Sequence, residues 1–111
     1  MNIAFALDYI PRRMKELGYG DNYLTRYRHV RVEVKQTVQI KAHNQLLFFI
    51  SPEENNLNIK SRRGVYNLTD YTINEQQHEH SGVVEINNNT GQNIYALFIQ
   101  VIPKNPKTQK A

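Results

Sequence analysis

Two histidines separated by one residue are the strongest candidates for metal chemistry in this chain. His78 and His80 flank Glu79 in a stretch that reads as a β-strand, and alternate strand residues point to the same face of a sheet. Two imidazoles on one face can share a metal ion, and Glu85 adds a carboxylate five residues after His80. The favoured interpretation is nevertheless a pair of solvent-exposed strand histidines, with metal binding as the alternative.

The segment from His78 to Gly91 resembles the first metal-binding motif of the cupin family, which combines a His-x-His pair with a later Glu and Gly. The resemblance implies a small metal-binding β-barrel. The sequence departs from the family pattern at two places, because Thr72 stands where the leading Gly is expected and no histidine follows His80. We therefore expect no complete cupin metal site and no cofactor.

Tyrosines and arginines are interleaved near the N-terminus, and these residue types are enriched at protein interfaces. The same types can stack on bases and follow the phosphates of single-stranded nucleic acid, and an OB-fold would fit this chain length. Scattered basic residues, balanced by glutamates, favour a protein partner. The set predicted to bind a partner is Tyr9, Arg12, Arg13, Tyr19, Tyr23, Arg26 and Tyr27.

No arrangement typical of catalysis is found in the sequence. There is no nucleophile elbow, no Gly-rich phosphate loop and no His-Glu-x-x-His helix. Glu53 and Glu54 are adjacent, so on an extended chain they point apart and form no acid and base couple. Arg62 and Arg63 lie between two expected strands, where they could grip a carboxylate or phosphate. We predict a binding protein rather than an enzyme.

Composition restricts the class of protein further. The chain has 111 residues, which fits one domain, and 40% of them are hydrophobic, enough for a packed core. The absence of cysteine excludes a disulfide-stapled scaffold and thiol catalysis. A net charge of +4 makes an anionic partner plausible.

The N-terminal 23 residues differ from the rest of the chain. Pro11 and Gly18 mark the two ends of a short helix of barely two turns, which must dock on another surface to be stable. The apolar stretch 3–7 is too short for a signal peptide or a membrane span. We expect residues 1–23 to form an arm that contacts the rest of the domain or another chain.

The remaining sequence alternates short strand patterns with turn signals, which predicts an all-β fold, a small β-sandwich or jelly roll, over residues 24–103. The stretch 46–50 is apolar on both faces and predicts a central strand. An Asn-rich connection predicts that the last two strands form a hairpin, and residues 104–111 read as a polar tail. The expected strands are 24–34, 37–42, 46–50, 57–60, 65–68, 71–73, 78–86 and 94–102.

The N-terminal arm and the segment Gly82 to Pro103 together resemble small capsid auxiliary, or decoration, proteins of tailed bacteriophages, those of crAss-like phages in particular. The resemblance implies a virion structural protein whose partner is the major capsid protein or another virion protein, with no membrane involved. Self-association and single-stranded nucleic-acid binding by an OB-like domain are the alternatives, and a cupin-like metal protein is a further one.

Overall fold

The computed structural model describes residues 1–50, 56–68 and 78–104. It consists of an N-terminal helix and a sheet, so the predicted all-β class with a helical N-terminus is confirmed. The expected strand 71–73 and nearly all of the polar tail lie outside the described residues. The elements are α1 (Ile3–Glu16), β1 (Tyr23–Val32), β2 (Thr37–Ile50), β3 (Leu57–Ser61), β4 (Gly64–Asn67), β5 (Glu79–Asn88) and β6 (Ile94–Pro103).

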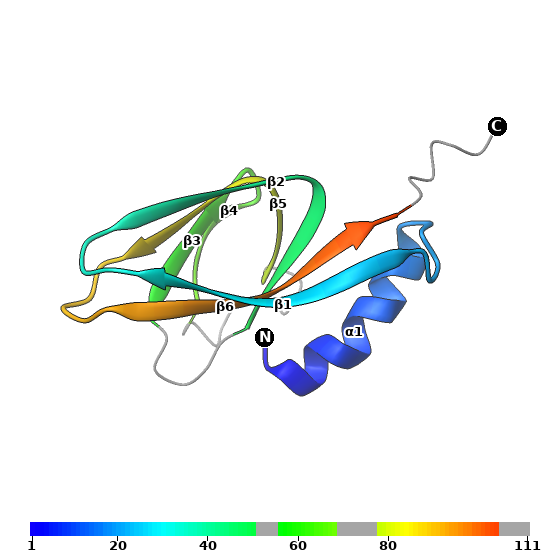
Figure 1. Ribbon diagram of the computed structural model, residues 1–111, viewed down its shortest axis with the longest axis horizontal. Helices are drawn as coiled ribbons and strands as arrows, with labels where there is room; N and C mark the ends of the chain where they lie inside the picture. Colours follow the sequence, from blue (N-terminus) through cyan, green and yellow to red (C-terminus); the bar gives the residue numbers. More distant parts are fainter. Residues whose placement is uncertain (51–55, 69–77, 105–111) are drawn as a thin grey trace.

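The six strands form one antiparallel sheet in the order β1-β6-β2-β5-β3-β4. The first half of β2 pairs with β5 and its second half pairs with β6. The sheet therefore coils into two layers, with β1 and β6 facing β5 and β3 as in a β-sandwich (Figure 1). Asn88 joins the layers, because its side-chain amide donates to the Val32 carbonyl over 2.9 Å.

The predicted hairpin between the last two strands is wrong. β5 and β6 lie on opposite sides of β2 and do not pair with each other. The Asn-rich connection instead crosses from one layer to the other, and Asn88 also donates to the Gln92 carbonyl over 2.7 Å. The apolar stretch of β2 is buried on both faces, so its backbone N–H and C=O groups are shielded from water and are satisfied by a strand on each side, β5 and β6.

The expected strands 37–42 and 46–50 are one strand, β2, and the residues between them form a bulge rather than a turn. The pairing of β2 with β5 shifts register between Ala42 and Leu47, and Asn44 adopts a positive φ of 60°. Gly82, which lies opposite Ala42, has a φ of 76°, a conformation that L side chains rarely adopt. The turn-forming residues therefore bend a continuous strand and carry it from one layer to the other.

Helix α1 begins earlier than the sequence indicated. The Asn2 side chain caps it by accepting from the Phe5 N–H over 2.7 Å, and Pro11 lies inside the helix rather than at its start. Ala6, Ile10 and Met14 are buried and share one helix face. The docking surface that the helix needs is the sheet of its own chain.

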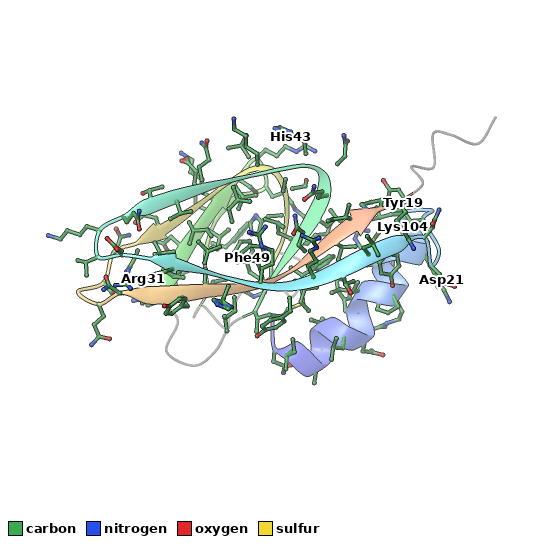
Figure 2. The ribbon with its side chains drawn as sticks, in the orientation of Figure 1. Tyr19, Asp21, Arg31, His43, Phe49 and Lys104 are labelled. Atoms are coloured by element: carbon green, nitrogen blue, oxygen red, sulfur yellow. The ribbon has the colours of Figure 1, made fainter. Side chains whose placement is uncertain are left out.

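Two hydrophobic cores meet at β2. Leu47 and Phe49 point into the core between the two layers, which we call the sandwich core. Phe48 and Ile50 point to the opposite face, where α1 covers a second core, the helix core. Figure 1 shows α1 against the outer side of the β1 and β6 layer, beyond the sandwich core. Phe49 lies at the centre of the domain (Figure 2).

Candidate binding surface

The two histidines of the His-x-His pair are buried in different environments. His78 lies close to the positive Met1 ammonium, and burial, followed by that charge, lowers the pKa of His78 from 6.5 to about 4. His80 points into the sandwich core, with Nδ1 2.7 Å from Ser61 Oγ and its ring edge-on to Phe49. The prediction that both are solvent-exposed is therefore wrong.

Glu85 does not join the histidines. Its neighbours Val84 and Ile86 are buried in the sandwich core, so Glu85 points to the opposite face of the sheet from His80. Within the described ranges, no three side chains of the metal-binding types come together. The three candidates His78, His80 and Glu85 thus do not come together in one place.

Glu79 lies at the centre of an ion cluster under α1. The carboxylate is 5% exposed. Its Oε1 accepts from Arg13 Nε over 2.8 Å, and its Oε2 accepts from Arg13 Nη2 over 3.1 Å and from Arg63 Nη1 over 3.0 Å. The hydrogen bond to Glu79 raises the pKa of Arg13. The cluster joins α1, the β3–β4 turn and β5, so we name it the Glu79 cluster.

Several members of the predicted Tyr/Arg set therefore contribute to the fold itself. Arg13 binds Glu79, and Arg12 forms an exposed ion pair of 3.0 Å with Asp8. Tyr9 stacks on Phe5, and burial raises the pKa of its hydroxyl, assisted by the negative Glu79. Tyr19 and Tyr23 pack against the helix core.

Arg12, Arg26 and Tyr27 are the exposed members of the set, and the last two lie on β1. Tyr27 is 58% exposed and contributes to an apolar groove of about 300 Å³ between α1 and β1. Leu7, on the helix side of this groove, is 66% exposed. The groove, which we call the α1–β1 groove, is lined by Ile3, Leu7, Ile10, Pro11, Tyr23, Thr25, Tyr27 and Ile99.

Sequence reasoning missed Ile3 and Leu7 as surface residues of this groove. Both are exposed, although the buried face of the helix is formed by Ala6, Ile10 and Met14. The sequence signal for this surface is that the helix carries more apolar residues than its buried face needs. That excess can be recognised only when the helix is taken to begin at residue 3.

Strand β1, which forms one side of this groove, also carries arginines. Arg28 is exposed, lies 5.8 Å above the Phe98 ring and donates to Gln100 over 3.4 Å. Arg31, near the far end of β1, is 3.9 Å from the Glu33 carboxylate (Figure 2). Among the described residues, neither Arg26 nor Arg28 forms an ion pair. β1 therefore presents positive charge to the solvent.

A second cavity, of about 400 Å³, lies near the β2 bulge. His43, Asn44, Arg62 and Ser81 contribute polar groups to it, and Leu17 and Tyr19 contribute apolar ones. Arg62 thus lines this cavity while its neighbour Arg63 binds Glu79.

No protein-family model matches the chain, and searches among curated proteins and among solved structures found no match either. No described helix has the length and apolar character needed to cross a membrane.

Proposed function

We propose that this protein is a non-enzymatic binding domain that acts as a capsid auxiliary protein, attaching to the major capsid protein through α1 and β1. The observation that carries the binding role is the α1–β1 groove. Exposed apolar side chains from two elements line one continuous depression, and such surfaces mark interaction sites on small soluble domains.

The capsid assignment is supported by the resemblance to auxiliary capsid proteins of tailed phages and by the charge of β1. Arg26 and Arg28 suit an acidic partner surface. A shell offers many copies of one binding site, so a modest contact suffices when subunits also touch their neighbours. The Glu79 cluster would keep α1 and the sheet in a fixed geometry, so the groove is formed before the partner arrives.

Co-sedimentation tests this proposal. Purified protein is mixed with capsids of a crAss-like phage, and bound protein is quantified by mass spectrometry after sedimentation. Leu7→Glu and Tyr27→Glu place a charge in the groove and should abolish binding. Val65→Glu is the matched control, because Val65 is 61% exposed on β4, at the opposite edge of the sheet.

Binding by the parent protein and by Val65→Glu, but by neither groove variant, would support the proposal. If neither the parent protein nor any folded variant sediments with the capsids, the capsid assignment is contradicted. Equal binding by the groove variants would instead exclude the groove as the contact.

Single-stranded nucleic-acid binding is the second candidate, and a feature of β1 favours it. His29 on β1 and Tyr95 on β6 form an exposed edge-to-face pair with ring centroids 5.7 Å apart. Arg31 is on the same strand as His29, so stacking groups and positive charge occur together. Fluorescence anisotropy with an oligothymidylate would test this role, which requires binding that weakens steeply as salt rises.

A further inference from the structure

We propose that the open edge of β1 binds an extended segment of the partner protein as an added strand, and that this segment alternates apolar and acidic residues. This inference rests on the proposed function in one respect, namely that the partner is a protein. It specifies the chemistry of the partner's contact segment and the backbone groups that receive it.

The edge of β1 is long, and no other described strand pairs with it. β1 is an outermost strand of the sheet and spans 10 residues, whereas β4, at the other edge, spans 4. Long edge strands present unpaired N–H and C=O groups that another chain can use. A segment that pairs along such an edge gains main-chain hydrogen bonds and reads alternate side chains through pockets.

The register identifies the backbone groups that are open. The Lys104 N–H donates to the Asn22 carbonyl over 2.9 Å, and the pairing of β1 with β6 continues from there without a shift. In an antiparallel ladder, every second residue bonds to the neighbouring strand. The even-numbered residues of β1 therefore bond to β6, and the odd-numbered Thr25, Tyr27 and His29 direct their backbone groups to the open edge.

The side chains of β1 define two different surroundings for an added strand. Thr25 and Tyr27 line the α1–β1 groove opposite Leu7, so the partner side chains on that face meet an apolar surface. Arg26 and Arg28 point to the other face, because successive strand residues alternate. A strand paired with β1 is therefore best matched by apolar residues toward α1 and acidic residues toward the arginines.

The same charges argue against a second copy of this chain as the occupant. Antiparallel pairing of β1 with another β1 would place arginines and His29 of one chain against arginines of the other, since the strand contains no acidic residue. Like charges that face each other across strands are destabilising. Residues 105–111 of this chain are also unsuitable, because they contain two lysines and no acidic residue.

The test uses a fluorescein-labelled peptide of alternating Val and Glu, matched to the 10 residues of β1, with binding followed by fluorescence anisotropy. The charge-reversed Val-Lys peptide is the control and should bind at least about tenfold more weakly. Raising the salt concentration should weaken binding of the Val-Glu peptide, because its contacts with the arginines lie near solvent.

Two matched variants test the use of the strand edge. Thr25→Pro removes an N–H that faces the open edge and leaves the β6 ladder intact, and should weaken peptide binding by about tenfold or more. Thr25→Ala keeps the N–H and should bind within about threefold of the parent. Circular dichroism and thermal melting test whether each variant is folded. If Thr25→Pro does not fold, Tyr27→Pro provides a second variant of the same edge.

Equal binding of the Val-Glu peptide to parent protein and to folded edge-proline variants would overturn the inference. A β1-to-β1 dimer detected by sedimentation and lost in Thr25→Pro would overturn it as well, since the occupant would then be a second copy. Competition with an oligothymidylate gives a further outcome. If the oligothymidylate displaces the peptide from the parent protein and binds Thr25→Pro as tightly as it binds the parent, the surface is assigned to nucleic acid instead.

Capsid co-sedimentation of Thr25→Pro separates this inference from the proposed function. If capsids bind Thr25→Pro and Thr25→Ala equally well, the capsid role stands and strand addition is overturned. A peptide that binds with the expected pattern, together with capsids that bind no variant, would support strand addition and contradict the capsid role.

Discussion

Arginines have opposite roles in two regions of the molecule, the Glu79 cluster under α1 and the edge of β1. In the cluster, Arg13 and Arg63 converge on one buried carboxylate. On β1, Arg26 and Arg28 have no carboxylate partner among the described residues. The difference shows that residue type alone does not mark an interface, because a carboxylate distant in sequence decides which arginines remain available to a partner.

The largest effect is expected from removing the shared carboxylate. Glu79→Leu leaves Arg13 and Arg63 side by side without the buried carboxylate that they share, and we expect it to lower the free energy of unfolding by about 3 kcal/mol. Glu85→Leu, on the same face of the same strand but outside the Glu79 cluster, should change it by less than about 0.5 kcal/mol. Urea denaturation measures both, and equal values for the two variants would remove the distinction between the regions.

The pH dependence of stability tests a second buried group near the N-terminal end of α1. The pKa of His78 is about 4 in the folded chain against an ordinary value of 6.5, so the unfolded chain takes up the proton first as pH falls. The contribution of neutral His78 to the free energy of unfolding is complete above pH 6.5 and decreases as the pH falls toward 4. We expect a loss of about 2 kcal/mol near pH 5.

Denaturation curves across this pH range, with the parent protein and His78→Gln side by side, measure the effect. The variant lacks the titrating ring, so its curve should be flatter, and His43→Gln, at an exposed position, serves as the control. Superimposable curves for the parent and His78→Gln would contradict the assignment.

A smaller effect is expected from truncating one arginine of the cluster. Arg13→Met removes two hydrogen bonds to Glu79 and the pair of 3.3 Å with the exposed Glu16 while Arg63 remains, and should cost about 1.5 kcal/mol. Arg12→Met, one position along the same helix, removes only the exposed pair with Asp8 and should cost about 0.3 kcal/mol. Thermal unfolding ranks the two, and the reverse ranking would contradict the structural role of Arg13.

The smallest effect on stability is expected at the edge of β1. Arg26→Ser should leave the free energy of unfolding within about 0.5 kcal/mol of the parent, although it should weaken binding of the acidic peptide. A stability loss as large as that of Arg13→Met would show that Arg26 also supports the fold, and the contrast between the two regions would fail.

Local patterns predicted the elements of this fold better than their pairing. The apolar stretch 46–50 was correctly predicted to be a central strand, because burial on both faces is visible in the residues themselves. The pairing of β1 and β2 with β6 has no local signal, so the Asn-rich connection suggested a hairpin that does not form. Likewise, Arg13 and Glu79 are 66 residues apart, and nothing near either of them indicates the other.

The candidate surface was predictable in part. Tyr27 and Arg26 were identified from their types, and both are exposed on β1. Leu7 was not identified, because the helix was placed too late in the sequence for its exposed apolar face to be recognised. The histidines were assigned the wrong environment because alternation along β5 does not reveal which layer covers each face.

The strand order has a consequence for how this chain folds during synthesis. β1 pairs with β6, and the second half of β2 does too, so the first two strands obtain this shared neighbour only after residues 94–103 have left the ribosome. Until then, the apolar residues of β2 have no strand to pair with in the β1 layer. We therefore expect the domain to fold late and in one step, with protection by a chaperone most valuable while β6 is still in the exit tunnel.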